Sequence, residues 1–184
     1  MAAAISQPTH PYFEEIGRLF YNYRLAQFNR RYYTVLLERA KKKNLWTQVF
    51  IGICVVSAAA LFSLTAAFPS LGSVVGKIAA VLSALSFVAS VVTTLFGWVQ
   101  TIDNITARVH AWHYAERQLE SGLRFLHYHA QSKREAELQV QFADEAFHSA
   151  DNIPDDGRQD MELSKEIQSE VNKAIPPDYV WTAL

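Results

Sequence analysis

The sequence predicts an all-α protein, a two-helix transmembrane hairpin with long cytoplasmic helical extensions that are coiled-coil-like in pattern. Two observations predict this fold class. Residues 45–102 contain a single charged side chain, Lys77, in a chain of which 19% of the residues are charged. On both sides of this block, apolar residues recur at helical spacing and not in the alternation typical of a β-strand.

The uneven distribution of charge divides the chain into four segments. Before the apolar block, eight Lys and Arg stand against three Asp and Glu, and after it eight stand against fifteen. The near-neutral total therefore conceals a basic beginning and an acidic end. We expect a basic, aromatic cytoplasmic helix in 1–44, the transmembrane hairpin in 45–102, a long cytoplasmic helix in 103–150, and an acidic short helix with a tail in 151–184.

The first helix is expected over Pro11–Lys43. Its apolar positions follow a 4-3 spacing, with Arg30 as the exception, at Tyr12, Ile16, Leu19, Tyr23, Ala26, Tyr33, Leu37 and Ala40. No helix breaker separates this segment from the first span, so the two are expected to form one long helix.

The two spans are expected at Leu45–Phe68 and Ile78–Ile102, which contain no charged residue. A helix of this length measures roughly 36 Å, whereas the hydrocarbon core of a bilayer is about 30 Å thick. Pro69–Lys77 between them contains a proline and two glycines, which predicts a tight turn. The alternative, a hairpin buried in a soluble protein, requires more surrounding chain than 184 residues provide.

Basic residues predict the orientation of the hairpin. Lys77 is alone in the connecting turn, whereas a cluster precedes the first span at Arg39, Lys41, Lys42 and Lys43. The positive-inside rule therefore places the connecting turn outside and both termini in the cytoplasm. We expect the cluster to contact anionic lipid headgroups; its position against a span disfavours the alternative, nucleic-acid binding.

The third segment has a second apolar stripe. We expect packing between cytoplasmic helices through Trp112, Glu116, Leu119, Leu123 and Leu126. Glu116 interrupts the stripe, and two placements are open: a salt bridge to an Arg such as Arg30, or a solvated edge position, which we favour. After a turn at Asn152–Gly157, a shorter helix is expected over Arg158–Ala174, and Tyr179, Val180 and Trp181 are expected to dock.

The second span has a stripe of small and polar residues on one face. Its members recur at 4-3 spacing and are Ala79, Ser83, Ser86, Ser90, Thr93, Gly97 and Gln100. Small residues let helix backbones approach closely, and hydroxyls can form hydrogen bonds between helices. Two interpretations are open, a packing seam between helices or a pore-facing stripe in an oligomer of about four or more chains.

Motifs for catalysis are missing from the sequence. The seven glycines are scattered and form no phosphate-binding loop, and there is no HExxH or CxxC pattern. His110 and His113 have a spacing that metal ligands can have, but no accompanying set of carboxylates or thiolates. We therefore expect no enzyme activity, no metal and no cofactor.

The order of elements resembles the SLATT family, two-helix membrane effectors associated with SMODS nucleotidyltransferases and SLOG nucleotide sensors. The resemblance covers roughly Phe13 to Ala130; its best motif runs from Ala107 to Glu120 and reads ARVHAWHYAERQLE, and Arg30-Arg31-Tyr32-Tyr33 is similar to the family's segment before the first span.

The resemblance implies an effector of bacterial anti-phage defence. Such a protein would oligomerise in the inner membrane and cause depolarisation and growth arrest or death. Its expected partners are the lipid bilayer, further copies of the chain, and a separate nucleotide-signal sensor or other defence protein. The alternative is a constitutive membrane scaffold or small channel subunit that recruits a cytoplasmic partner.

Overall fold

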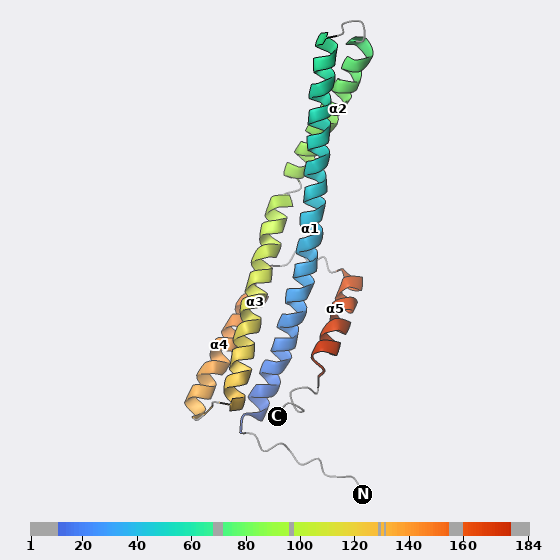
Figure 1. The fold of residues 1–184 in the computed structure, drawn as a ribbon. Coiled ribbons are helices and arrows are strands. Elements are labelled where there is room, and N and C mark those ends of the chain that lie inside the picture. Colours follow the sequence, from blue (N-terminus) through green and yellow to red (C-terminus); the bar gives the residue numbers. More distant parts are fainter. Residues whose placement is uncertain are drawn as a thin grey trace. The chain divides into compact units, whose positions relative to one another are not determined.

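The computed structural model describes residues 11–67, 72–95, 98–128, 130, 132–154 and 160–177. These residues form five α-helices and no strand, which confirms the all-α prediction. Figure 1 shows the helices in chain order; they are α1 (Phe13–Ala67), α2 (Gly72–Leu95), α3 (Trp98–Tyr128), α4 (Lys133–Asp151) and α5 (Met161–Ala174).

The chain forms two compact units. The first, here called the bundle, comprises Met1–Val35 and Ile105–Leu184, and the second, here called the hairpin, comprises Leu36–Asn104. Helix α1 contributes to both, because it continues without interruption for 55 residues. This confirms the prediction of one long helix, and the absence of proline between Phe13 and Ala67 explains it.

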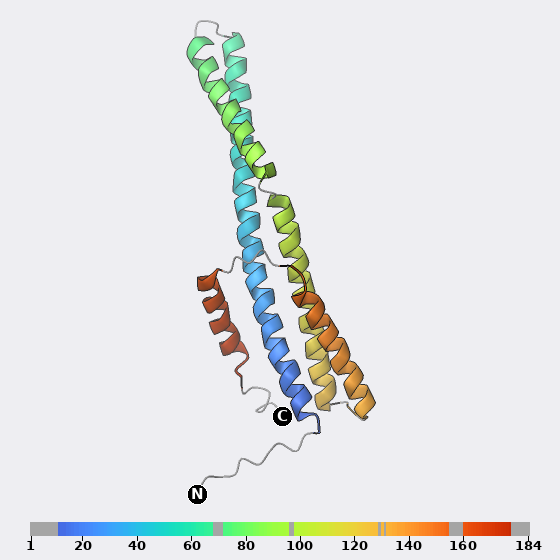
Figure 2. The same ribbon diagram turned by 180° about the vertical axis from the view of Figure 1, so that it is seen from behind.

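In the bundle, α3 and α5 lie along different sides of α1, and α4 packs on α3 (Figures 1 and 2). The core is formed by α1, α3 and α4, and its members are Ile16, Leu19, Phe20, Ala26, Trp112, Ala115, Leu119, Leu126, Ala136, Val140, Ala143, Phe147 and Ala150. The Trp112 and Phe147 rings meet edge to face with their centroids 5.5 Å apart. The apolar stripes recognised in the sequence thus form the core of this unit.

The prediction of a single helix over 103–150 is wrong, because α3 ends at Tyr128 and α4 begins at Lys133. The Ser132 side chain caps α4 by accepting a hydrogen bond from the Glu135 amide at 3.3 Å. Ser followed three residues later by Glu is the pattern of a capping box, which marks a helix start. The chain turns back here and buries the apolar face of α4 in the core.

Helix α5 confirms the short helix expected near the end of the chain, although it begins at Met161 and the preceding residues 155–159 are outside the described part. Its buried residues, Leu163, Ile167 and Val171, recur every four positions. Several polar contacts attach it to α1; among them, the Asp160 amide donates to the Tyr32 hydroxyl at 2.9 Å, and Arg24 donates to the Ile175 carbonyl at 3.1 Å. The predicted docking of Tyr179, Val180 and Trp181 lies outside the described residues.

In the hairpin, α2 begins at Gly72, within the segment that we expected to form the turn over Pro69–Lys77. A glycine inside a helix costs only about 1 kcal/mol, so Gly72 and Gly76 do not prevent helix formation once Pro69 has been passed. Toward its other end α2 stops at Leu95, and α3 resumes at Trp98. The predicted second span, Ile78–Ile102, is therefore divided between two described helices.

Candidate functional site

The hairpin exposes most of its large apolar side chains. On α1 these are Leu45, Trp46, Val49, Phe50, Ile53, Val55, Val56, Phe62 and Leu64, and on α2 they are Val74, Ile78, Val81, Leu85, Phe87, Val88 and Val91. Soluble monomers rarely expose a continuous apolar patch larger than a few hundred Å². This surface therefore requires an apolar environment or further protein to cover it.

Both helices of the hairpin are long and apolar enough to cross a membrane. In the most apolar window of each helix, only 11% of the residues are buried. A core helix of a soluble protein, in contrast, is mostly buried. The exposure of these windows thus favours a hydrocarbon environment for the hairpin.

Small side chains fill the contact between α1 and α2, which lie side by side in both views (Figures 1 and 2). Cys54 and Ala58 are the buried residues of the α1 part, and Ala79 and Ser86 are those of α2. The Ser86 hydroxyl donates to the Leu82 carbonyl of its own helix at 2.9 Å, so its hydrogen bond is satisfied locally. Contacts through small residues are typical of helices that pack in a membrane.

The structure places the members of the small and polar stripe in different environments. Ala79 and Ser86 are buried against α1, whereas Ser83 and Ser90 are exposed along the border of this contact. Gln100 is exposed on α3, and the side chains at Thr93 and Gly97 are outside the described residues. Part of the stripe is therefore buried within the chain, and part of it is exposed.

Arg30 and Glu116, the charged residues that interrupt the two apolar stripes, contact each other in the bundle. Arg30 Nη1 of α1 lies 2.9 Å from Glu116 Oε2 of α3, and the Glu116 side chain is only 9% exposed. The favoured placement of Glu116 at a solvated edge is therefore wrong, and the alternative salt bridge is confirmed. Burial removes water from the carboxylate, so the guanidinium is needed to compensate its charge.

Further polar groups surround this pair. Gln27 Nε2 donates to Glu116 Oε1 at 3.0 Å and lies 2.9 Å from the Tyr23 hydroxyl. Arg30 Nη1 also lies 3.3 Å from His113 Nδ1, where it donates when that nitrogen carries no proton. Burial raises the pKa of the Tyr23 hydroxyl, and the neighbouring carboxylates of Glu120 and Glu116 raise it further. We call these five residues, Tyr23, Gln27, Arg30, His113 and Glu116, the polar cluster.

A second arginine joins the same two helices. The Arg108 guanidinium donates to the Tyr33 hydroxyl at 2.9 Å and lies over the Tyr33 ring, 5.1 Å from its centroid. Arg108 is 7% exposed. The positive-inside rule counts an arginine close to a span only as evidence for the cytoplasmic side of the membrane. In the structure, the Arg108 side chain also packs between α1 and α3.

The residues expected to pack between cytoplasmic helices come together. Trp112, Leu119 and Leu126 are buried in the bundle core, and Leu123 packs against it half-buried. His113 belongs to the polar cluster, whereas His110 is exposed. In the described part of the chain, no group of three His, Cys, Asp or Glu side chains could hold a metal ion.

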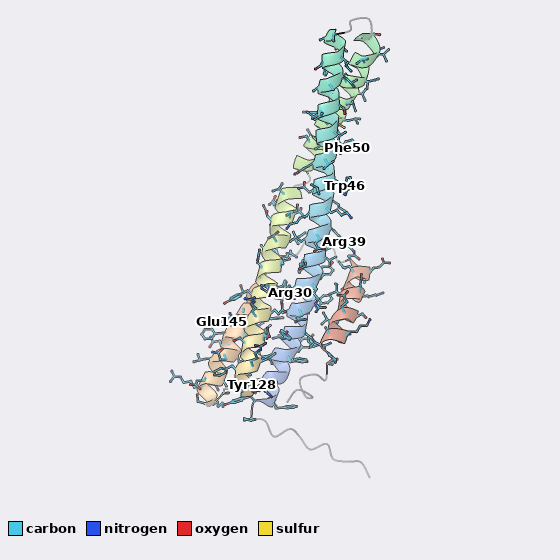
Figure 3. All side chains as sticks on the ribbon, viewed as in Figure 1. Arg30, Arg39, Trp46, Phe50, Tyr128 and Glu145 are labelled. Atoms are coloured by element: carbon cyan, nitrogen blue, oxygen red, sulfur yellow. The ribbon has the colours of Figure 1, made fainter. Side chains whose placement is uncertain are left out.

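The predicted headgroup residues Arg39, Lys41, Lys42 and Lys43 are all exposed on α1. Figure 3 shows Arg39, Trp46 and Phe50 in sequence along this helix. The basic residues thus come directly before the exposed apolar surface of the hairpin.

Comparisons with known proteins add no family. No family model, no curated protein and no solved structure matches the chain.

Proposed function

We propose that this protein is a membrane effector of a bacterial anti-phage defence system. Its hairpin spans the inner membrane with both termini in the cytoplasm, and several chains assemble into a pore that depolarises the cell and causes growth arrest or death. The observation that carries this proposal is the hairpin surface, which is apolar on nearly all sides and unburied within one chain.

The resemblance of Phe13–Ala130 to the SLATT family supports the defence role, and the lack of a catalytic motif supports a physical action on the membrane over an enzymatic one. In this proposal the bundle receives the signal, from a separate nucleotide-signal sensor or another defence protein.

Oligomerisation is supported by small residues that remain exposed on the hairpin. Gly52, Ala59 and Ser63 share one face of α1, and Ser83 and Ser90 follow the border of the α2 contact. Two helices cannot enclose a water path, so a pore needs about four or more chains that each contribute such faces. Close approach of backbones through small residues is how helices associate where no hydrophobic effect drives them together.

The test uses a substitution that the single chain tolerates. A Cβ atom added at Gly52 would meet no other atom within 4 Å, so Gly52→Leu leaves the hairpin intact but keeps a neighbouring helix at a distance. We expect induced expression of the natural chain to depolarise bacterial cells, as read with a potential-sensitive dye, and Gly52→Leu and Ser90→Leu to prevent this. Ile53→Leu, at an exposed α1 position about 100° around the helix from Gly52, is the control outside the small-residue face and should remain active.

The constitutive scaffold, the alternative function, predicts the opposite results. Expression would then be harmless, and gentle purification in detergent would yield a stable complex with a soluble partner. An unchanged membrane potential in cells that express the natural chain together with its trigger would contradict the effector proposal. A monomeric mass in detergent after activation would contradict the pore.

A further inference from the structure

One face of α1 combines three cations with an indole. Arg39, Lys42, Lys43, Trp46 and Thr47 line a shallow hollow of about 410 Å³. Their spacing of three, four, seven and eight residues from Arg39 places them on the same side of the helix over about two turns. Because one helix holds all five residues, their relative positions follow from α1 alone.

The two lysines of this face differ from the arginines of α1 that form ion pairs. In the bundle, Arg18 pairs with Asp144 at 2.7 Å, Arg30 with Glu116 at 2.9 Å and Arg31 with Glu170 at 3.8 Å. Lys42 and Lys43, in contrast, are exposed, and no carboxylate of the described residues lies within ion-pair distance of either ammonium group. Like charges at neighbouring helix positions repel one another, so an anion bound between them would stabilise this face.

The apolar surface of the hairpin begins in the same two turns. Leu45, Trp46, Val49 and Phe50 are exposed, with Trp46 65% accessible. Indole rings favour the boundary between headgroups and acyl chains, where the ring is in an apolar layer and its N–H can reach a polar atom. Lysines directly before a span lie at the level of the lipid phosphates. The Thr47 hydroxyl already donates to the Lys43 carbonyl at 2.9 Å, so the binding groups that we consider are the lysine ammonium groups and the indole.

We propose that this α1 face is a binding site for the phosphodiester headgroup of an anionic phospholipid. Lys42, Lys43 and Arg39 contact the phosphate oxygens, and Trp46 packs against the glycerol and upper acyl region. The proposal rests on the part of the proposed function that places the hairpin in a bilayer, and it is independent of pore formation.

The neighbouring Lys41 provides a matched control. It has the same charge and lies at nearly the same height, but it faces away from the hollow, whose lining does not include it. If the lysines only attracted the chain to a negative membrane surface, Lys41→Gln and Lys43→Gln would weaken lipid binding equally. A site on one face predicts that only Lys43→Gln weakens binding.

The experiment uses the full chain purified in detergent and native mass spectrometry of lipid adducts. Phosphatidylglycerol and phosphatidylcholine of equal chain length are supplied in equal amounts. We expect the natural chain to retain phosphatidylglycerol in preference to phosphatidylcholine. Lys43→Gln should weaken this retention about fivefold, the factor that corresponds to about 1 kcal/mol per cation near an anionic surface, whereas Lys41→Gln should change it less than twofold. Trp46→Ala should weaken retention of both lipids.

Three outcomes would overturn the proposal: equal effects of Lys41→Gln and Lys43→Gln, no preference for phosphatidylglycerol, or displacement of the lipid by inorganic phosphate or a single-stranded oligonucleotide at similar concentration. The last outcome would assign the site to a soluble phosphate or to nucleic acid. Failure of the membrane assignment is distinguishable from these outcomes, because the chain would then be monodisperse without detergent. Selective lipid retention without depolarisation of cells would contradict the pore alone.

Discussion

The ion pair between Arg30 and Glu116 provides the sharpest test of the bundle. In Glu116→Leu the arginine loses its counter-charge and Gln27 Nε2 loses one of its two partners, while the volume of the side chain is roughly kept. We expect this single substitution to destabilise the bundle. The double variant Arg30→Leu/Glu116→Leu should recover most of the loss, because replacing a buried ion pair by apolar residues is often neutral or stabilising.

The size of the effect follows from distance and burial. Two unit charges 2.9 Å apart attract by at most about 6 kcal/mol at an effective dielectric constant of 20. The desolvation of Glu116 offsets part of this, and the Arg30 side chain, 32% exposed, regains some hydration when its partner is lost. We therefore expect Glu116→Leu to cost about 2–4 kcal/mol, with a coupling energy of about 2–3 kcal/mol in the double-mutant cycle.

Hydrogen–deuterium exchange of the full chain in detergent micelles measures this loss, because amides of Ile105–Tyr128 and of Phe13–Val35 report the opening free energy of the bundle alone. Asp144→Ala is the control: it breaks the Arg18–Asp144 pair, whose side chains are 57% and 23% exposed, and should cost at most about 1 kcal/mol. A coupling energy below about 0.5 kcal/mol, or equal losses for Glu116→Leu and Asp144→Ala, would refute the reasoning.

Three further predictions concern the bundle. The raised pKa of Tyr23 means that the folded state favours the neutral phenol. This contribution to stability is complete below pH 10 and is lost as the pH rises through the raised pKa. In a pH series of the same exchange measurement, Tyr23→Phe should therefore reduce the loss of stability at alkaline pH. At Gly122 an added Cβ would lie 3.3 Å from Leu19 Cδ1 and 3.4 Å from Ala143 Cβ. Gly122→Ala should therefore change the opening free energy of the bundle by less than about 1 kcal/mol. Gly122→Leu should overpack the contact between three helices and cost about 1–3 kcal/mol, which circular dichroism would detect as a lower thermal midpoint. Ser132→Ala removes the cap of α4 and should cost about 1 kcal/mol and speed amide hydrogen exchange in the first turn of α4. Ser132→Asp, which keeps a capping side chain, is the control. Unchanged amide exchange in Ser132→Ala would contradict the capping role.

Periodicity predicted most of the helical architecture. The 4-3 stripes correctly indicated helices on both sides of the hairpin, although they did not indicate the division of 103–150 into α3 and α4. The charge-free stretch indicated the hairpin, because both patterns arise from local spacing and composition. The irregularities of the stripes were harder to interpret. Arg30 and Glu116 break two separate stripes, and spacing alone left Glu116 either in a salt bridge or at a solvated edge, the placement that we favoured and that the structure contradicts.

The division between α3 and α4 shows where local patterns were insufficient. Residues around Ser132 contain no proline or glycine, so the apolar stripe seemed to continue. The Ser132–Glu135 capping pattern was present in the sequence, but the turn depends on a distant contact, the packing of Phe147 on Trp112. Contacts between residues far apart in the chain are not encoded in periodicity.

The α2 stripe illustrates a different difficulty. The spacing of Ala79 and Ser86 placed them on one face with Ser83 and Ser90, but only the position of α1 decides which part of that face is covered. Periodicity therefore defines the face but not its boundary with the neighbouring helix.

The ion pair in the bundle core also restricts the register of the two helices that it joins. A slip of α3 along α1 by one helical turn, about 5.4 Å, would carry the Glu116 carboxylate beyond reach of Arg30 and of the Gln27 amide. Leucine layers alone would tolerate such a slip far better, since one leucine replaces another. The pair therefore favours the observed alignment of the two helices, and any rearrangement that moves α3 along α1 must first separate these two charges.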